Sequence, residues 1–496
     1  METPKVLDEK ASVHGVEHQA GLDLSTFRNG EFDGIVIPPR GSAERKRLEN
    51  RLKWKIDLTI LPIVFCMYIL NYLDRNNIAA AKLGTFMEDL GLTATQYSTC
   101  VSILFVGYIS MQIPSNLILE KVGHPSIYLP TAMAFWGVVS ACTGAVQGFG
   151  GMVVVRLLIG FLEAAFYPGV LFYLSCWYTR QEIAARTAIF VGGSWISGAF
   201  SGFIAYGVMK NLEGAHGIAA WRWLFIIEGA ATIGFALLAI PILPDLPGTT
   251  RWLSKEERLL GIIRMIEDVG ARDEDLHAFG AAFVGVKLAA KDPKVVNLFI
   301  MMFCFSATAG INTVFPTIVN SLGYDREKTL LLTAPPWVLC TITSVLNSLH
   351  SDYTGERYKH MLWGPTLALI GFVIGISSTA KAPRYVAMML LLQVYNSWAL
   401  GFAWLTNTIP RPPVKRAAAS ACVNVGGNIP NIFVPYFFSY TGATPHFYVG
   451  FAICICFALF GLLAATTLKI QLSRLNKKLE NGEKVDGLSG ESFKFL

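Results

Sequence analysis

Long apolar stretches constrain this chain more than any other feature. A helix that crosses a bilayer needs about 20 mostly apolar residues, and stretches of that kind follow one another along the sequence. Six precede residue 244 and six follow residue 294, at 56–82, 95–118, 127–147, 150–176, 186–209, 222–243, 295–319, 329–350, 361–380, 385–409, 417–440 and 446–468. The sequence therefore predicts an all-α membrane protein with 12 transmembrane helices in two six-helix bundles.

The composition also indicates many spans and no disulfide or metal framework. Hydrophobic residues make up 53% of the chain and charged residues only 15%, whereas soluble domains average about 25% charged residues. The 9 cysteines all lie in apolar stretches and form no CxxC pair. We interpret them as small buried side chains. We expect no metal, no cofactor and no nucleic-acid partner.

Polar segments divide the chain into five parts. Tails at 1–55, expected to be mostly disordered, and 471–496 flank bundles at 56–243 and 295–470, and a charged linker at 244–294 separates the bundles. Basic residues crowd both outer borders, so the positive-inside rule places both termini in the cytoplasm. In the linker, "WLSKEERLLGIIRMI" begins with a capping box, formed by Ser254 and Glu257. This pattern predicts a helix on the cytoplasmic surface.

Charge inside the predicted spans is confined to the first half. Asp74 and Arg75 lie in the first span, Arg156 and Glu163 in the fourth, and Glu228 in the sixth. A charge at the bilayer centre costs at least ~2.5–3.5 kcal/mol and is usually retained for ion or substrate handling. Arg156 and Glu163 share one helical face about 10 Å apart. For Arg156 and Glu228, a purely structural ion pair or packing role is the alternative.

Four of these side chains can form a charge switch. Asp74, Arg75, Arg156 and Glu163 are neutral together when all are ionised, and protonation of one carboxyl leaves a net charge of +1 that attracts an anion. When the anion leaves, the proton is lost more easily. The pattern predicts proton–anion symport, with Asp74 and Glu163 as the proton-coupling groups and Arg75 and Arg156 as anion-binding groups.

The second half offers neutral polar groups inside its predicted spans. Its side-chain amides could supply hydrogen bonds to a substrate, and packing between helices is the alternative for each of them. The candidates for substrate binding are Asn312, Gln393, Asn424 and Asn428.

Two polar turns occupy equivalent places after the second and the eighth spans. "LILEKVGHPS" (117–126) contains Glu120 and Lys121, and "LHSDYTGERYKH" (349–360) contains Asp352 and Arg357. Each turn has an acid, a glycine and a basic residue. We expect these four charged side chains to form a cytoplasmic gate; a solvated turn is the alternative.

The paired turns and several longer segments resemble known transporters. "SDYTGER" resembles the second-half loop motif of the major facilitator superfamily, and "LEKVGHP" is a first-half copy that lacks the usual Asp and tandem basic residues. More narrowly, the fungal allantoate-permease-like branch of the anion:cation symporter family is similar to "YLDRNNIAAA", "QIPSNLILEKVG", "RLLIGFLEAAFYPGVLFYLSCWY", "WRWLFIIEG", "LPDLPGTTRWLSKEER" and "NVGGN".

The resemblance implies a fold, a substrate class and roles for particular residues. It implies the major facilitator fold and transport of a small organic anion, such as nicotinate, pantothenate, biotin or allantoate, with protons at the plasma membrane. The family's coupling and anion-binding residues correspond to Asp74, Arg75 and Glu163. The amides near its substrate correspond to Asn424 and Asn428.

Other functional classes find less support in the sequence. The histidines lie in tails, loops or span ends, and no HExxH motif or GxxxxGK[ST] loop occurs, so neither hydrolysis nor an ATP-driven pump is expected. We expect a non-enzymatic, multi-pass plasma-membrane protein that takes up a small organic anion with protons, lies in the lipid bilayer, and is a monomer. Export of a secondary metabolite by proton antiport and a non-transporting sensor are the alternatives.

Overall fold

The computed structural model describes residues 35, 37–179, 182–250, 252–269, 279–409, 413–439 and 447–481. Within these residues the chain is helical and contains no strand, so the expected all-α fold is confirmed. The chain up to residue 34 and the chain after residue 481 lie outside this description, and with them most of both predicted tails.

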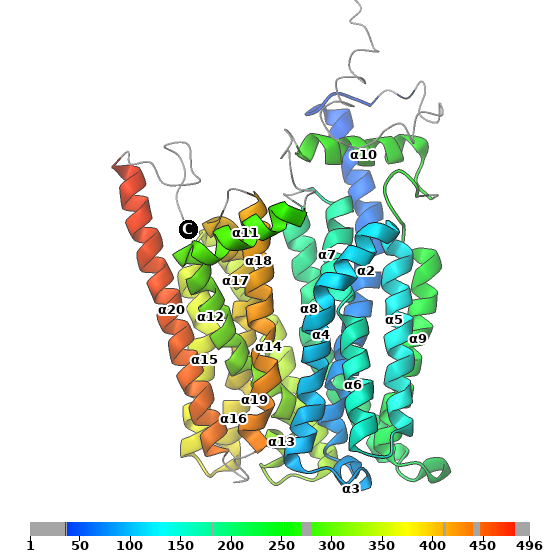
Figure 1. The fold of residues 1–496 in the computed structure, drawn as a ribbon, viewed down its shortest axis with the longest axis vertical. Coiled ribbons are helices and arrows are strands. Elements are labelled where there is room, and N and C mark those ends of the chain that lie inside the picture. The colour runs from blue at the N-terminus through cyan, green and yellow to red at the C-terminus, as the bar shows by residue number, and fades with distance from the viewer. Residues whose placement is uncertain are drawn as a thin grey trace, which may run out of the picture.

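Two groups of long helices flank a linker (Figure 1). The first half comprises α2 (Ala43–Ala81), α3 (Phe86–Asp89), α4 (Ala94–Val122), α5 (Pro125–Cys142), α6 (Phe149–Glu163), α7 (Phe166–Trp177), α8 (Ile183–Asn211) and α9 (Ala220–Ile242). The linker carries α10 (Lys255–Val269) and α11 (Phe279–Lys291). The second half comprises α12 (Pro293–Ala309), η4 (Gly310–Val314), α13 (Phe315–Asn320), α14 (Arg326–Thr354), α15 (Tyr358–Ser377), α16 (Lys381–Leu391), η5 (Leu392–Tyr395), α17 (Asn396–Thr408), α18 (Pro413–Asn428), α19 (Pro430–Ser439) and α20 (Tyr448–Glu480).

Most of these helices are long and apolar enough to cross a membrane. Of the described residues, 10 helical segments meet the length and hydropathy that a span requires. Helix α4 and the α18–α19 pair run beside them from one end of the bundles to the other (Figure 1). Together they give each half six crossings, as the apolar stretches predict.

Helix ends follow from local sequence. Thr93 and Gln96 form a capping box at the start of α4, each side chain accepting a hydrogen bond from the other residue's backbone N–H. Gly123 ends α4 and Gly355 ends α14, with φ of 68° and 65°, a left-handed conformation that glycine adopts without steric strain. The two predicted polar turns, 117–126 and 349–360, therefore begin within the last turns of α4 and α14 and continue past the glycines that end these helices.

Four of the crossings are interrupted. The fourth divides into α6 and α7 after Glu163, and the eleventh divides into α18 and α19 after Asn428. The seventh passes through η4, which contains Asn312, and the tenth passes through η5, which contains Gln393. An interruption frees backbone polar groups, so it is tolerated only where protein or a cavity, not lipid, surrounds it. Four predicted site residues thus lie at helix interruptions.

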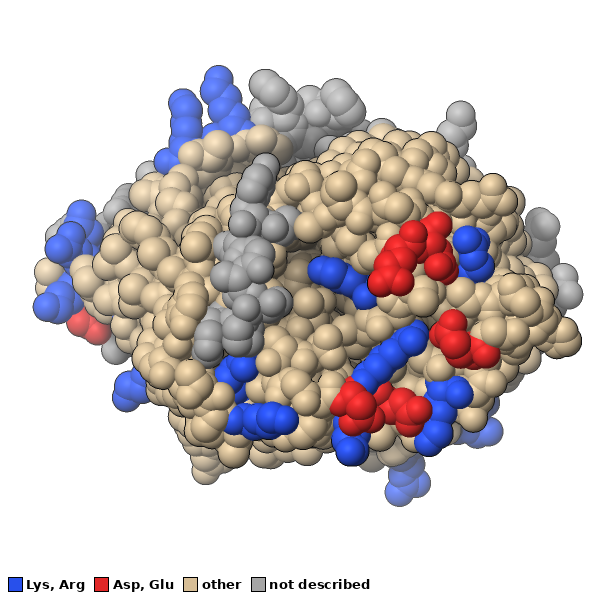
Figure 2. All heavy atoms as spheres, turned by 90° about the horizontal axis from the view of Figure 1, so that it is seen from below, with Lys and Arg blue, Asp and Glu red and all other residues tan. Residues whose placement is uncertain are grey.

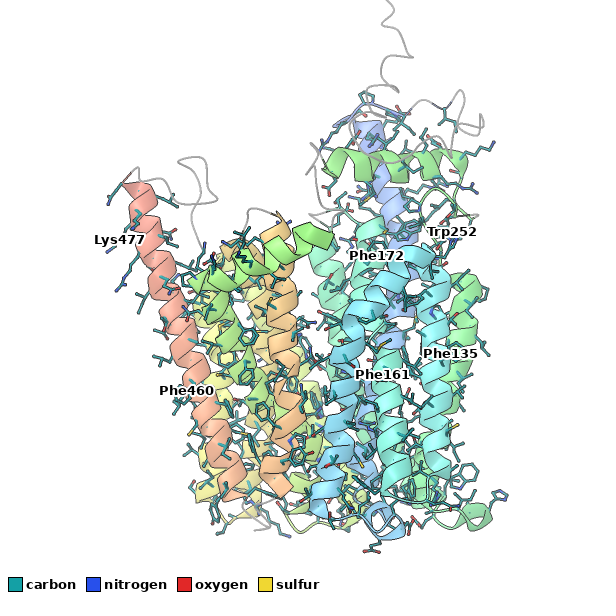
Figure 3. All side chains as sticks on the ribbon, in the orientation of Figure 1. Phe135, Phe161, Phe172, Trp252, Phe460 and Lys477 are labelled. Atoms are coloured by element: carbon teal, nitrogen blue, oxygen red, sulfur yellow. The ribbon has the colours of Figure 1, made fainter. Side chains whose placement is uncertain are left out.

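The outer flanks of both halves are apolar. Phe135 on α5 is 59% exposed and Phe460 on α20 is 62% exposed, and both lie on the outside of the helix bundles (Figure 3). Exposed phenyl rings on opposite flanks are typical of helices whose outer faces contact lipid.

The linker helices mark one end of the molecule, called here the linker face; the opposite end, which carries α3 and α13, is the far face (Figure 1). On the far face, ion pairs join the two halves: Lys210 lies 3.4 Å from Glu327, and Arg326 lies 3.6 Å from Glu213. Figure 2 shows this face, where acidic and basic side chains lie next to one another. The halves are therefore in contact at this end.

Two glycines of "GGSWISGAFSG" bring α8 close to α14. A Cβ atom added at Gly198 would lie 2.5 Å from the ring of Trp337, and one added at Gly202 would lie 2.5 Å from Oγ1 of Thr333. Real side chains do not approach so closely, so only glycine allows these helices their present separation. This glycine-lined face of α8 therefore lies at the contact between the halves.

Ion pairs tie α10 to the first half. Arg264 pairs with Glu182, and Nζ of Lys53 lies 3.1 Å from the same carboxyl. Nζ of Lys55 lies 2.5 Å from Oε1 of Glu257. Burial alone would raise the pKa of Glu182, but Arg264 and Lys53 outweigh burial and hold that pKa below its ordinary value. These contacts clamp α10 onto the N-terminal part of α2 and the start of α8.

The linker contains one more helix than the sequence predicts. The predicted capping box is confirmed, because Ser254 N donates to Glu257 Oε2 at 3.0 Å and Glu257 N donates to Ser254 Oγ at 3.2 Å. Helix α11, which the sequence did not predict, packs against α18 of the second half. Each half therefore has a linker helix of its own (Figure 1).

Candidate functional site

A cavity of about 110 Å³ lies between the halves. Helices α2, α4, α6 and α8 line it from the first half, and α12, η4, α14, η5, α17, α18 and α19 line it from the second. Arg75 and Arg156 are the charged side chains in its described lining. Apolar and hydroxyl side chains form part of the lining, and its aromatic and amide side chains are Tyr68, Tyr72, Phe105, Trp195, Phe305, Trp337, Tyr395, Trp398, Asn76, Asn312, Asn428 and Asn431. We call this space the central cavity.

A smaller space of about 30 Å³ adjoins the central cavity. The two share Tyr68, Tyr72, Arg75, Trp398 and Asn428, and the smaller one is also lined by Glu163. We call it the side pocket. Arg75 thus lies at the boundary between the two spaces, and Glu163 lines the side pocket next to it.

Arg75 and Glu163 form an ion pair at this boundary. Nε and Nη2 of Arg75 lie 2.9 Å and 2.6 Å from Oε2 of Glu163. The Glu163 side chain is 0% exposed and the Arg75 side chain is 10% exposed. Because Arg75 keeps contact with the cavity while Glu163 is enclosed, a ligand that enters can reach the cation more directly than the carboxyl.

Aromatic rings surround the guanidinium group of Arg75. Its Cζ lies 5.1 Å from the ring centre of Tyr72, 5.7 Å from that of Phe105 and 5.0 Å from that of Tyr108. Rings at these distances attract a cation and restrict its movement. They stabilise Arg75 without neutralising it, so its charge stays available to an anion.

Arg156 is a second cation beside the cavity, held by backbone groups. Its Nη2 donates to the carbonyl of Arg75 at 3.2 Å and its Nε donates to the carbonyl of Cys100 at 3.4 Å. Its Nη1 is buried with no hydrogen-bond partner among the described residues. Gly160, one turn along α6, allows this packing, because a Cβ there would collide with the Leu104 carbonyl of α4.

Asp74 lies away from the other three members of the predicted charge cluster. It is 0% exposed and does not line either space. Its Oδ1 accepts a hydrogen bond from Ser140 Oγ, and its Oδ2 accepts one from Thr232 Oγ1, both at 2.7 Å. The structure therefore divides the four-residue cluster: Asp74 points between α5 and α9, while Arg75, Arg156 and Glu163 stay together.

The amides of the second half have different surroundings. Asn312 lines the central cavity and its Nδ2 donates to Oδ1 of Asn76 at 3.4 Å, across the boundary between the halves. Asn428 lines both spaces, and Asn424 lines the side pocket. Three of the four predicted amides thus face the space between the halves.

Gln393 was predicted to contact substrate, but the structure places it away from both spaces. It is 1% exposed and lines neither the central cavity nor the side pocket. Its Oε1 accepts hydrogen bonds from Thr343 Oγ1 at 2.6 Å and from Asn396 Nδ2 at 3.1 Å, and its Nε2 donates to Met389 O at 3.1 Å. Its hydrogen bonds link α14, η5 and α17 within the second half, which is the packing role left open for each amide.

The predicted gate residues are only partly described. Asp352 and Arg357 form an ion pair of 2.6 Å at the end of α14, and Nη1 of Arg357 also donates to Ser351 Oγ. This pair joins neighbouring residues of the second half. Glu120 and Lys121 lie in the last turn of α4, and their side chains are outside the described residues.

Comparison with known proteins identifies the family. The sequence profile of the Major Facilitator Superfamily matches residues 64–411. The chain belongs to the Major Facilitator Superfamily. "MFS-type transporter cnsO" of Penicillium expansum is 33% identical over 454 residues, which cover 89% of this chain and 86% of that protein. "Putative tartrate transporter" of Agrobacterium vitis is 31% identical over 442 residues, which cover 88% of this chain and 98% of that protein.

Solved structures show the same superfamily fold. A D-xylose–proton symporter matches with a TM-score of 0.60 and 16% sequence identity, covering 88% of this chain and 99% of that protein. At this identity the likeness concerns the fold alone. The major facilitator fold implied by the polar turns is therefore confirmed.

Most residues that line the central cavity were not predicted from the sequence. Tyr68, Tyr72, Asn76 and Ala79 lie on the same face of α2 as Arg75 and line the central cavity. Their spacing of three and four residues could have identified them, because such positions share a helical face. The aromatic residues of α8, α14 and α17 had no comparable pattern, since they meet only when the two halves come together.

Proposed function

We propose that this chain is a secondary active transporter that takes up a small organic anion together with protons by alternating access. The observation that carries the proposal is the Arg75–Glu163 ion pair at the edge of a cavity between the two halves. Within the superfamily, the anion:cation symporter family, in its allantoate-permease-like branch, is the group that we infer from the sequence segments. The plasma membrane is the location that we propose.

Competition for Arg75 provides the coupling step. While Glu163 is ionised it neutralises Arg75, and a second carboxylate gains little from binding there. When Glu163 accepts a proton, Arg75 can pair with the carboxylate of a substrate, and charge-assisted hydrogen bonds make that contact strong. When substrate leaves, Glu163 can lose its proton and pair with Arg75 again. Proton and anion therefore bind together and leave together.

Arg156 contributes to the binding of the anion as a second cation beside the central cavity. Its unpartnered Nη1 adds positive charge beside the central cavity, and arginine stays protonated throughout. We propose that Arg156 orients the anion, while Asn312, Asn424 and Asn428 supply neutral hydrogen bonds. Asp74 remains a proton-coupling candidate, acting from behind α2 and without contact to substrate.

The cavity lining favours an anion with a flat or apolar body. Rings of Trp195, Trp337 and Trp398 face the central cavity from both halves, and aromatic side chains pack well against flat or apolar groups. The tartrate named for the relative is a small carboxylate, which supports the general class. We propose a monocarboxylate, whose one charged end pairs with Arg75 while Arg156 adds positive charge beside the same group.

The arrangement of the halves supports an inward-facing state. The described cross-half ion pairs lie on the far face, and the basic start of α2 lies at the linker face. If the linker face is cytoplasmic, as the positive-inside rule predicts, the cavity is closed toward the outside. Asp352 and Arg357 would then belong to the gate that closes the cytoplasmic side.

The test is uptake by the purified chain in liposomes with an imposed pH gradient. A panel of labelled carboxylates should include a flat aromatic monocarboxylate and a hydroxylated dicarboxylate, each measured with and without a protonophore. We expect accumulation of the monocarboxylate only when the outside is acidic, and loss of accumulation with the protonophore. Accumulation in the opposite direction would instead support export by antiport, and uptake that ignores the pH gradient would contradict proton coupling.

A further inference from the structure

A second group of buried acids lies on the opposite side of α2 from the central cavity. Asp74 is 0% exposed and Glu228 is 3% exposed. Asp74 accepts a hydrogen bond from Thr232, which lies about one helical turn after Glu228 on α9, and helices α2, α5 and α8 pack against α9. Neither carboxyl lines the central cavity or the side pocket. The two acids therefore lie behind α2, outside the two spaces that Arg75 lines, and we call their surroundings the compartment.

Hydrogen bonds distinguish the two carboxyl groups. Each oxygen of Asp74 accepts a hydrogen bond from a hydroxyl group, Ser140 on one side and Thr232 on the other. Both oxygens of Glu228 are buried without a hydrogen-bond partner among the described residues. Donated hydrogen bonds stabilise an ionised carboxylate. Asp74 has this stabilisation and Glu228 does not.

Asn77 points to a polar occupant of this compartment. It is 0% exposed, and both its Oδ1 and its Nδ2 lack a partner among the described residues. A buried amide of this kind is normally hydrogen-bonded. A protonated carboxyl on Glu228 can supply what Asn77 lacks, because a carboxylic acid both donates and accepts.

No described cation faces Glu228 from the helices around it. Helix α5 carries no charged residue, and Arg75 of α2 pairs with Glu163. The charged residues of α8 are also paired elsewhere, Arg186 with Asp57 and Lys210 with Glu327. On α9 itself, Arg222 donates to the carbonyls of Gly144 and Val146. Two neighbouring carboxylates without a cation cannot both ionise in a buried site.

We propose that Asp74 and Glu228 form a buried carboxyl pair that holds one proton, carried by Glu228, while Asp74 carries the negative charge. Because Glu228 is neutral, the compartment contains one negative charge, on Asp74, and the hydroxyl groups of Ser140 and Thr232 stabilise it. Glu228 is a positioning residue in this arrangement: it touches no substrate, and it allows Asp74, on the cavity-lining helix α2, to stay ionised. The proposal goes beyond the transport proposal, since it concerns a protonation state that can be read without any substrate.

Infrared difference spectroscopy on the purified full-length protein at pH 7.5 tests this assignment. A protonated carboxyl and a carboxylate have separate stretching bands, and only the former shifts when exchanged into D2O. The comparison uses wild type, Glu228→Gln and Asp74→Asn, each also carrying Glu163→Gln so that the cavity carboxyl does not contribute. We expect Glu228→Gln to remove a protonated-carboxyl band and Asp74→Asn to remove a carboxylate band.

The opposite pattern would overturn the proposal, because loss of the protonated band in Asp74→Asn would place the proton on Asp74. Loss of a carboxylate band in Glu228→Gln would show that Glu228 is ionised, which also overturns it. If Glu228→Gln does not fold, the Asp74→Asn spectrum still decides between these states. In the Glu163 wild-type background we expect Glu228→Gln to keep uptake within twofold, since the amide preserves shape and neutrality. A folded variant with uptake reduced more than tenfold would show that Glu228 must release its proton.

Discussion

Arg75 meets Glu163 through a single carboxyl oxygen. Its Nε and Nη2 both lie within 3 Å of Oε2, at 2.9 Å and 2.6 Å, while Oε1 is buried without a partner among the described residues. An arginine fork matches a carboxylate best when each nitrogen meets its own oxygen. The present contact is therefore not the best one that either group could make, which suits an ion pair that must separate in every transport cycle.

Replacing Arg75 with Ala should abolish uptake. Two hydrogen bonds to a charged group are worth about 1.5–3 kcal/mol each, so we expect uptake to fall at least about 100-fold. Arg75→Lys keeps the charge but cannot make a two-pronged contact, and should retain part of the activity. Uptake is measured per molecule at the cell surface, with Arg75→Ala/Glu163→Gln as a folding control, since that variant leaves no buried unpaired carboxylate. Near-normal uptake by Arg75→Ala would rule out its role in anion binding.

Glu163→Gln should separate exchange from accumulation. The amide is permanently neutral, so Arg75 stays open to the substrate whatever the pH. We expect the variant to exchange labelled for unlabelled substrate across the membrane, while its accumulation under a pH gradient falls at least tenfold. Exchange and gradient-driven uptake are measured in the same liposomes. A variant that still accumulates substrate in response to the pH gradient would place the coupling proton elsewhere.

Gly202→Ala should disturb the contact between the halves, and Gly207→Ala provides a matched control on the same helix. A Cβ at Gly202 would lie 2.5 Å from Thr333 Oγ1 and 2.8 Å from the Leu330 carbonyl, whereas a Cβ at Gly207 would meet nothing within 4 Å. Overpacking of this kind costs about 1–3 kcal/mol, while an exposed helical Gly→Ala change gains up to about 1 kcal/mol. We expect a lower unfolding midpoint in Gly202→Ala alone, measured in detergent. Equal midpoints for both variants would show that α8 and α14 are not packed as described.

Acid should release α10 from the first half. The pKa of Glu182 is held below its ordinary value of 4.5 because Arg264 and Lys53 outweigh the effect of burial. A carboxyl whose pKa is lowered by folding stabilises the fold above its unfolded pKa, and that contribution disappears as pH falls through the lowered value. We therefore expect faster hydrogen exchange in α10 below about pH 4.5. Glu182→Gln should give the same loss of protection at pH 7, and Glu256→Gln, an exposed neighbour on α10, should not. Unchanged protection in Glu182→Gln would contradict the clamp.

The spans were predictable because they depend on local properties. Length and apolarity decide whether a segment can cross a bilayer, and both can be read without knowing what surrounds the segment. Helix interruptions were less evident, since residues such as Asn312 and Asn428 are compatible with a continuous helix. Their effect depends on neighbours from both halves, which line the cavity at these points.

Asp74 and Arg75 point to different sides of α2, although the charge pattern predicted one cluster that contained both. A helix turns about 100° per residue, so adjacent side chains point in different directions. Asp74 and Arg75 therefore could not both face the same cluster. Which face would meet the cavity could not be read from the charges alone. The aromatic residues beside Arg75 decide it, because Tyr68 and Tyr72 lie on its side of α2.

Helix α2 has a mechanical consequence that follows from this arrangement. Arg75 contacts the cavity in which substrate would bind. The preceding residue, Asp74, is hydrogen-bonded to hydroxyl groups of α5 and α9. A rotation of α2 that brings Arg75 closer to bound substrate must strain the two hydrogen bonds of Asp74 on the opposite side of the helix. The backbone between two consecutive Cα atoms thus transmits force between cargo and the interior of the first bundle, over a single peptide bond.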